Sequence, residues 1–338
     1  MFGLNQPFWF TEEPDEATVR LLKSVTLGSN GARYRHLGIE HRIHQLYRPL
    51  FVSIVRRDRV LANATFCRRA SNWYVRYFAF DQLLQARSMP VSNIRQTNGL
   101  KWKLNAFFDN ALLDPAGPQS FYAYIDPRNE RSLNMSANFG FTSAAKIATQ
   151  TFSRLRPKNH SVEVIDDLTK IKKWISNRFG DRPFFHDYQT LNNTPFYVLR
   201  ENGEIVAFAK VHRASWQIER LPGKNGALLT RLVPFIPIVN RIIQPAHHCF
   251  GVVDAVWSKN NDKRYLSHLF EGILAREKVH VLHWWVDHKD SLYRSARKTL
   301  NWGLLHKING VHNVDLVVKT KEQLIVDKPV FVSGFDFI

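Results

Sequence analysis

The chain has 338 residues, which is enough for two domains of ordinary size, each with its own hydrophobic core. Hydrophobic residues make up 44% and charged residues 22% of it, which are values of a globular protein and exclude a disordered one. No apolar run reaches the roughly 18 residues that cross a bilayer, and the N-terminus lacks the pattern of a signal peptide.

Charge is the strongest anomaly of the composition. Lys and Arg number 47 against 29 Asp and Glu, giving a formal net charge of +18 that is spread along the whole chain. Such a field favours polyanionic partners: CoA phosphates, nucleic acid such as tRNA, acidic carrier proteins or anionic lipid headgroups. Composition does not choose among them. Cys67 and Cys249 stand far apart without metal-ligand spacing, so we expect a reducing, cytoplasmic compartment.

The first half of the sequence alternates predicted strands and helices. Acidic residues at the start of 14–25 and apolar residues at helical spacing indicate an amphipathic helix. The basic, Gly-containing segment 26–38 is expected to be a loop. Two apolar runs flank the polar turn 56–59 and predict a β-hairpin. The remaining expected elements are strands at 8–10 and 73–80 and helices at 40–47 and 99–113.

The stretch 121–141 predicts a strand, a turn, a helix and the start of another strand. Aromatic and small residues alternate at 121–125, as in a buried strand. Asp126 and Pro127 end this strand, and Pro127 suits the first turn of the next helix. Gly140 is placed to end that helix with a left-handed residue.

The layout then repeats after a polar linker at 154–160. Asn202-Gly203 and Asn309-Gly310 are hairpin turn signals, and the second lies between expected strands at 304–308 and 314–318. Further strands are expected at 162–165, 196–199, 204–212, 250–257 and 279–286, helices at 169–179, 263–278 and 291–302, and one more strand in the apolar tail 328–338. Two copies of one layout, 1–155 and 161–338, account for the length better than one large domain.

An insertion at 221–248 distinguishes the second copy. Pro234 and Pro237 interrupt its apolar run 228–243, so it predicts one or two short helices. Packing on the sheet is the expected role. The wall of an apolar pocket, or peripheral contact with a membrane through Arg231 and Arg241, are the alternatives.

Two segments of the first copy resemble the GCN5-related N-acetyltransferases. The spacing Asn129-x2-Ser132-x7-Gly140-Phe141 is similar to the last motif of that family, and the family's phosphate loop runs Gln/Arg-x-x-Gly-x-Gly/Ala into a helix. The segment 96–101 matches the loop at its first and fourth positions and has Lys at the sixth. Free backbone N–H groups and the helix dipole suit such a loop to a pyrophosphate.

This resemblance implies an α/β (α+β) fold: two tandem domains, each a mixed, mostly antiparallel twisted sheet flanked by helices, with a splayed strand pair. It also implies acetyl-CoA or another acyl-CoA as a substrate and no metal. The implied acyl-CoA-binding residues all lie in the first copy: Phe78, Ala79, Phe80, Arg95, Gln96, Thr97, Asn98, Gly99, Leu100, Lys101, Tyr124, Asn129 and Ser132.

The acid–base residues are less clearly marked. The family often places Tyr seven residues after the motif Asn, where this chain has Ser136. Asp81 and Glu40 are the nearest candidate bases in the first copy. The second copy has Asp254 in a central strand but no Gly in its loop at 259–264, so the first copy is the predicted CoA binder.

Histidines gather in the second copy and raise the question of a metal site. His280 and His288 share one face of an expected strand and His283 takes the other, so they do not converge. No Cys accompanies them at finger spacing. We therefore expect surface or core histidines.

The sequence predicts an N-acyltransferase that moves an acyl group, expected to be acetyl, from acyl-CoA to an amine by direct attack. A carboxylate would deprotonate the amine, and a backbone N–H of 78–80 would polarise the thioester. Two alternatives stay open: an aminoacyl-tRNA-dependent transferase resembling the Fem enzymes, and a non-catalytic basic protein that binds RNA or a membrane surface.

Overall fold

The computed structural model describes residues 8–28, 32–56, 59–81, 100–187, 195–322, 324 and 326–338. Its strands are β1 Phe8–Thr11, β2 Arg33–Leu37, β3 Pro49–Arg56, β4 Arg59–Arg69, β5 Asn72–Phe80, β6 Ser120–Ile125, β7 Thr142–Ser153, β8 Val162–Ile165, β9 Phe196–Glu201, β10 Glu204–Arg220, β11 His248–Ser258, β12 Val281–Asp287 and β13 His312–Thr320. Its α-helices are α1 Glu16–Ser24, α2 Ile39–His44, α4 Leu100–Leu113, α5 Glu130–Asn138, α6 Leu168–Phe179, α7 Gly226–Leu232, α8 Pro237–Ile242, α9 Lys263–Glu277, α10 Ser291–Ala296 and α11 Leu304–Asn309. Three short 3₁₀ turns complete them: η2 Val233–Phe235, η3 Lys259–Asn261 and η4 Gly334–Phe337.

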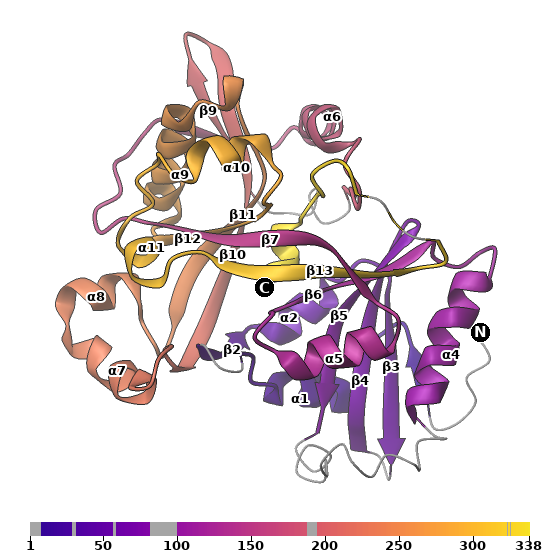
Figure 1. The fold of residues 1–338 in the computed structure, drawn as a ribbon. Coiled ribbons are helices and arrows are strands. Elements are labelled where there is room, and N and C mark those ends of the chain that lie inside the picture. The colour runs from indigo at the N-terminus through magenta and orange to yellow at the C-terminus, as the bar shows by residue number, and fades with distance from the viewer. Residues whose placement is uncertain are drawn as a thin grey trace.

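Thirteen strands of the described chain form one sheet. Its order is β1-β3-β4-β5-β6-β13-β7-β12-β11-β10-β9-β8, with β2 added to β10. The two parallel neighbour pairs, β5 with β6 and β11 with β12, hold only three residue pairs each and then splay apart. All other pairs are antiparallel, and helices flank the sheet (Figure 1). The predicted mixed sheet with a splayed pair in each half is confirmed.

The two halves of the sheet exchange a strand at the centre of the molecule. β13, from the second half of the chain, pairs with all of β6 through its residues 315–320 and with β7 through its residues 312–318. β7, from the first half of the chain, pairs with β12 of the second half. Both strands therefore run side by side through the middle of Figure 1 and join the halves into one sheet.

Short-range chemistry explains many element boundaries. Aspartate side chains accept hydrogen bonds from the first turns of four helices, as N-caps do: Asp15, Asp167, Asp262 and Asp290. The hairpin between β9 and β10 turns at Asn202 and Gly203, which have φ values of 52° and 82°. Positive φ at both positions is the requirement of a type I′ turn, so this hairpin signal is confirmed.

The core of the first half is an aromatic cluster between α4 and the sheet. Phe66, Phe107 and Phe121 are completely buried, and Phe108 makes an edge contact with Phe121 at 4.9 Å between ring centroids. A second cluster packs α9 on the sheet of the second half, and a third runs through the centre of the molecule and contains residues of both halves. The continuous sheet and the shared central core hold the two halves together.

Four expectations about secondary structure are wrong. The segment 26–38, expected as a loop, contains β2, which pairs with β10 from the second half. The expected strand 304–308 is helix α11, which Gly303 and Gly310, both at positive φ, bracket. The tail 328–338 forms no strand but the turn η4, and the expected helix 291–302 ends at Ala296.

The tail is held by a buried ion pair. The Arg69 guanidinium of β4 donates to both carboxylate oxygens of Asp336, at 2.7 and 2.5 Å, and also to the Tyr122 hydroxyl at 2.7 Å. Arg76 also lies 3.5 Å from Asp336, so removal of Asp336 would leave two buried cations without this carboxylate, a change that costs about 3–5 kcal/mol for a buried pair. The segment 333–338 is thus fixed between the two halves.

The insertion forms the two short helices that the sequence predicts, but it does not pack on the sheet as expected. We call residues 226–242 the α7–α8 lobe. Val233 and Ile242 are buried, whereas most other large apolar side chains of the lobe are exposed. In Figure 1 the lobe projects from the ends of β10 and β11.

Candidate active site

The splay of the first half begins after Tyr74 and Tyr122. Pairing between β5 and β6 joins residues 72–74 to 120–122 and stops there. Tyr74 and Tyr122 are buried, whereas Tyr124 on β6 and Phe78 on β5 are only half-buried. The strands therefore open where the sequence predicts an acyl-CoA arm to lie.

Beyond the splay point, β5 has a partner on one side only among the strands that the structure describes. Phe78, Ala79 and Phe80 pair with residues of β4, and β6 no longer lies opposite them. Because successive N–H groups of a strand point to opposite sides, the open side carries backbone donors. The Arg131 guanidinium of α5 lies 5.9 Å from the centre of the Phe80 ring, so it bridges the gap between α5 and β5.

Asn129 and Ser132 stand at the start of α5. The Asn129 side chain caps the helix by accepting a hydrogen bond from the Ser132 N–H at 3.2 Å. None of the nine residues of α5 is fully buried. Ser136 donates to the carbonyl of Leu133 at 2.9 Å, so its hydroxyl is engaged within the helix.

The predicted phosphate loop lies outside the described residues. This concerns Arg95, Gln96, Thr97, Asn98 and Gly99, and also the side chains of Leu100 and Lys101. Helix α4 begins at Leu100, so the last two positions of the predicted loop, 100 and 101, belong to its first turn. The loop assignment stays a prediction from the sequence.

The two candidate bases of the first half are both paired with cations. Arg59 donates to Asp81 at 2.8 and 3.1 Å. Glu40 is exposed on α2 and pairs with Lys23, whose hydrogen bond lowers the pKa of Glu40.

Asp254 is buried inside the second half. One carboxylate oxygen accepts hydrogen bonds from the Gly334 N–H at 2.9 Å and the Ser333 hydroxyl at 3.2 Å, and it lies 3.0 Å from His212 Nε2. Burial opposes ionisation, but His212, Lys210 and the Gly334 N–H keep the pKa of Asp254 below its ordinary value. Its carboxylate therefore anchors the tail segment 333–334.

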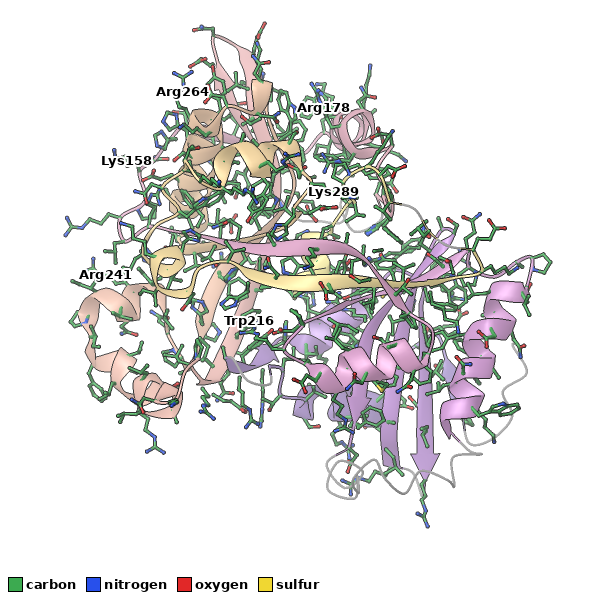
Figure 2. All side chains as sticks on the ribbon, viewed as in Figure 1. Lys158, Arg178, Trp216, Arg241, Arg264 and Lys289 are labelled. Atoms are coloured by element: carbon green, nitrogen blue, oxygen red, sulfur yellow. The ribbon has the colours of Figure 1, made fainter. Side chains whose placement is uncertain are left out.

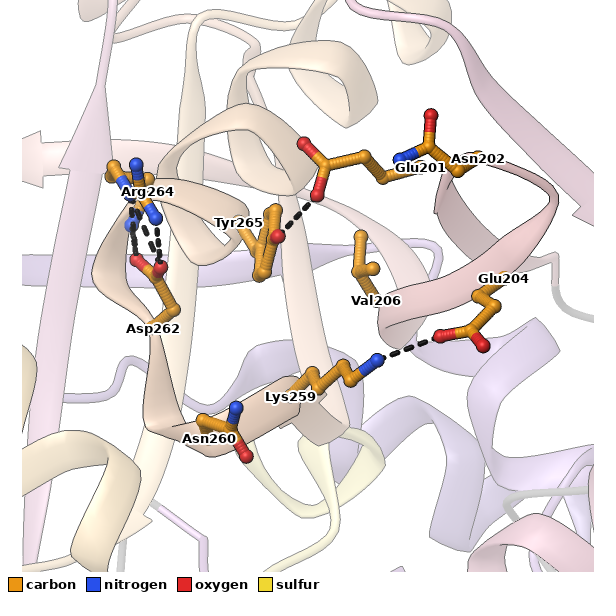
Figure 3. A pocket seen from close by; sticks show the side chains of 9 residues that line it. All are labelled: Glu201, Asn202, Glu204, Val206, Lys259, Asn260, Asp262, Arg264 and Tyr265. Atoms are coloured by element: carbon orange, nitrogen blue, oxygen red, sulfur yellow. Dashed lines mark hydrogen bonds and ion pairs between the residues drawn. The ribbon is translucent and has the colours of Figure 1, made fainter.

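The loop of the second half lines a pocket of about 440 Å³, in which its charged side chains pair with one another or with their neighbours (Figure 3). Asp262 caps α9 by accepting from the Arg264 N–H at 2.8 Å, and it also pairs with the Arg264 guanidinium at 2.7 Å. Lys259 pairs with Glu204 at 2.6 Å. A carboxylate thus occupies the helix start where a phosphate would sit, as the sequence indicates.

The gap between the splayed strands β11 and β12 of the second half is filled by residues 330–332. Residues 330–332 lie between the ends of β11 and β12 and leave a void of only about 20 Å³. The Val330 N–H donates to Asp287 at 2.8 Å, and the Phe331 N–H donates to the carbonyl of Pro183 at 2.9 Å. Val330 and Phe331 are 1% and 3% exposed, so the chain itself plugs this gap.

A cavity of about 370 Å³ lies between the two halves. Its wall includes residues of β2, β6 and the turn after it, β7, β10, β11, β12, α11, β13 and η4. Tyr124 and Asn129, at the β6–α5 corner of the first splay, are part of this wall. The cavity therefore reaches the place where the first half is open.

Aromatic rings dominate the cavity wall. Tyr34 stacks on Trp216 with ring centroids 3.9 Å apart, and Tyr124 lies 4.8 Å from Trp285. The Trp285 N–H donates to the Thr149 hydroxyl at 2.7 Å, but the buried Trp216 N–H has no hydrogen-bond partner. Trp216 lies at the junction of the two halves (Figure 2).

Four histidines also line the cavity, and they are uncharged at neutral pH. Burial lowers the pKa of His36 and of His283 to about 3 and that of His248 to about 4. The pKa of His312 is lowered mainly by burial and further by Arg128. The His283 Nδ1 atom lies 3.2 Å from the Thr151 hydroxyl. Within the described residues, no group of three or more metal-ligating side chains is close enough to hold a metal ion.

One ion pair stands beside these neutral groups. The Arg128 guanidinium donates to both oxygens of Asp126, at 2.6 to 3.2 Å, and both residues line the cavity. Hydrogen bonds from Arg128 outweigh the effect of burial and lower the pKa of Asp126. Asp126 is therefore a charged carboxylate at the β6–α5 corner.

Sequence reasoning did not find this cavity. Tyr34 and His36 lie on the strand that was expected as a loop, and Trp216 lies beyond the expected end of its strand. His283 was singled out by the sequence, and it lies in β12, whereas His280 and His288 flank that strand. Its hydrogen-bond partner Thr151 is 132 residues away along the chain, which no local spacing reveals.

No family model matches the sequence, and no curated protein sequence matches it either. Solved structures do. An N-myristoyltransferase of Saccharomyces cerevisiae with bound myristoyl-CoA aligns with a TM-score of 0.57 and 9% identity, over 96% of this chain and 81% of that one. A candidate acetyltransferase of Pyrococcus horikoshii aligns with a TM-score of 0.55 and 8% identity, over 98% and 96%. A GCN5-related N-acetyltransferase of Sphaerobacter thermophilus aligns with a TM-score of 0.49 and 14% identity, over 95% of this chain and 98% of that one.

At these identities the likeness concerns the fold. The first two alignments cover nearly the whole chain, including both halves and the exchanged strands. The chain shares the fold of this N-myristoyltransferase and of the Pyrococcus horikoshii protein, with its two halves joined in one sheet.

Proposed function

We propose that this protein is an acyl-CoA-dependent N-acyltransferase. The first half would bind the acyl-CoA, and the central cavity would receive the amine. One observation carries the proposal: Tyr124 and Asn129 belong both to the corner of the open splay and to the cavity wall. A thioester in the splay and an amine in the cavity would meet at this corner.

The occupied splay and helix start of the second half support our proposal that the acyl-CoA binds in the first half. Its helix start holds the Asp262 carboxylate, and its splay holds residues 330–332. Only the first half keeps an open splay among the described strands. The yeast enzyme with bound myristoyl-CoA shares this fold, which supports an acyl-CoA as the donor.

The reaction would be a direct transfer. The amine nitrogen attacks the thioester carbonyl, the C–N bond forms, the C–S bond breaks, and CoA leaves as a thiolate that takes up a proton. A backbone N–H of 78–80 on the open side of β5 would stabilise the oxyanion, as a preorganised donor does. Acetyl is the acyl group that we propose first.

The cavity itself favours an amine that is already neutral. Burial disfavours positive charge there strongly enough to lower the pKa of His36 and His283 to about 3. The same desolvation would lower the pKa of a bound ammonium group, so a proton would leave before or during binding. Histidines with such low pKa values cannot hold that proton, but they can accept a hydrogen bond from the amine N–H. Asp81, Glu40, Ser136 and Asp254 do not line the cavity, and Asp126 is the nearest carboxylate to the corner.

Native mass spectrometry of the purified protein tests the donor. We expect the spectrum to show CoA or acyl-CoA bound to the protein. A separate activity assay offers acyl-CoAs of increasing chain length with a panel of primary amines, and we expect it to detect release of the free CoA thiol. Trp285→Ala should reduce kcat/KM by roughly tenfold or more, because an interface aromatic is lost from the acceptor wall. The matched variant Trp257→Ala, on the far part of β11, should leave it unchanged. Absence of CoA binding together with salt-dependent tRNA binding would overturn the proposal and favour the aminoacyl-tRNA alternative.

A further inference from the structure

The α7–α8 lobe exposes apolar side chains at a density found nowhere else in the described chain. Fifteen large hydrophobic residues are exposed in all, and six of them fall between 228 and 238. Phe235, at 81%, is the most exposed of the fifteen. The six are Leu228, Leu229, Leu232, Phe235, Ile236 and Ile238. Single exposed hydrophobic residues are normal on a soluble protein, but a continuous group marks a surface that contacts something else.

The lobe is an ordered structure and not a frayed loop. The Thr230 hydroxyl donates to the carbonyl of Gly226 at 2.7 Å and accepts from the Leu221 N–H at 2.8 Å, which closes the base of α7. Val233 and Ile242 anchor the lobe as its buried apolar residues. The apolar surface is therefore held in place while it stays exposed.

Every charged residue of the lobe and its flanks is basic. No acidic residue occurs between Glu219 and Asp254. Lys224, Arg231 and Arg241 are all exposed, and Arg241 lies on the lobe in Figure 2. An apolar surface bordered only by cations is complementary to an anionic, apolar partner.

The basic charge around the lobe favours a lipid surface over a second copy of this chain as its partner. In a symmetric dimer each patch would meet a copy of itself, which would bring Arg231 and Arg241 against like charges. The lobe is also a projection and not a groove, as Figure 1 shows. Short apolar helices that project with basic flanks suit a lipid surface, where the apolar side chains enter the acyl boundary and the cations meet headgroup phosphates.

We propose that the α7–α8 lobe docks on the surface of an anionic membrane. Phe235 and Ile238 enter the lipid, and Arg231 and Arg241 contact the headgroups. None of the described helices is long and apolar enough to cross a bilayer, so the contact is peripheral. Leu221, Pro222 and Ile243, at the two ends of the lobe, also line the central cavity, so docking holds this wall of the cavity beside the membrane.

Vesicle sedimentation with the full chain tests this proposal. We expect the protein to pellet with phosphatidylcholine vesicles that contain phosphatidylglycerol, to stay in solution with pure phosphatidylcholine, and to be released by salt. Phe235→Glu with Ile238→Glu should lower the partition coefficient by at least roughly tenfold, because an apolar anchor is lost and negative charge is added. Arg231→Glu with Arg241→Glu should do the same while leaving the apolar anchor intact.

Leu113→Glu is the matched control, since Leu113 is 67% exposed at the end of α4. It should bind vesicles like the wild type, and the circular dichroism spectra and Tm values of all variants should agree. Equal binding of the Phe235→Glu, Ile238→Glu variant would overturn the proposal. So would a wild-type dimer that this variant dissociates, because a second copy would then be the occupant of the surface.

Discussion

Each half of this molecule contains one parallel strand pair that splays apart, but the two halves differ in what fills the splay. In the first half, pairing of β5 and β6 stops after Tyr122, and the strands beyond are half-buried and open toward the central cavity. In the second half, residues 330–332 fill the gap, and Asp262 fills the helix start. Under the proposed function, the first half binds the acyl-CoA and the second half supplies a wall of the cavity: His248, His283 and Trp285 face the cavity at the corner of the first half.

The largest expected effect concerns CoA binding by the first half. Gly99→Glu should abolish measurable CoA affinity in isothermal titration calorimetry, because a carboxylate would face the diphosphate in the predicted loop. The equivalent change at the start of α9, Lys263→Glu, should leave the affinity unchanged if the second half binds no CoA. Unaltered affinity of the first variant would refute the loop assignment, and an equal loss in both would remove the difference between the halves.

The plug of the second half offers a second way to test the comparison. Phe331→Ala removes a buried aromatic side chain and should lower the free energy of unfolding by about 3–5 kcal/mol. Urea denaturation measures this change. The CoA affinity of the folded variant should equal that of the wild type, and a new second equivalent of bound CoA would show that the plug had been blocking a functional site.

The smallest expected effect is on the pH dependence of the free energy of unfolding. His36, His248 and His283 have folded-state pKa values near 3 to 4, below the value of about 6.5 in the unfolded chain. The unfolded state therefore binds more protons between about pH 6.5 and 4, and stability falls as the pH falls through this window, by at most roughly 1.4 kcal/mol per pH unit for each histidine.

His248→Phe should reduce that slope by the contribution of one proton, measured by urea denaturation between pH 7 and about 4.5. His247→Phe, at the exposed neighbouring position, is the control and should leave the slope as it is. An unchanged slope in His248→Phe would mean that this ring is not held neutral by the cavity.

Much of the local structure could be predicted from the sequence. Apolar periodicity and caps located the helices α1, α6 and α9 to within two residues at their ends, and Asn202-Gly203 fixed a hairpin. The corner at Asn129 was found because the motif is short and contiguous. These features depend on residues that lie close together along the chain.

The wrong predictions have one physical cause: these segments take their structure from contacts with segments that are distant along the chain. β2 is too short and polar to be recognised alone, and it forms because β10, about 180 residues away, offers an edge. Asn309-Gly310 looks like a hairpin turn, but Leu305 gains burial as part of a helix that Gly303 begins. The exposure of the α7–α8 lobe could not be predicted either, because an apolar run gives no sign of whether another surface of the same chain covers it.

The position of β13 has a consequence for biosynthesis. Because it lies between β6 and β7, both of these strands lack a neighbour until residues 312–320 have left the ribosome. The nascent chain therefore carries open strand edges through most of its translation, and such edges pair readily with other polypeptides. The sheet would close only after residues 312–320 have been made, and a chaperone could shield the open edges of β6 and β7 until then.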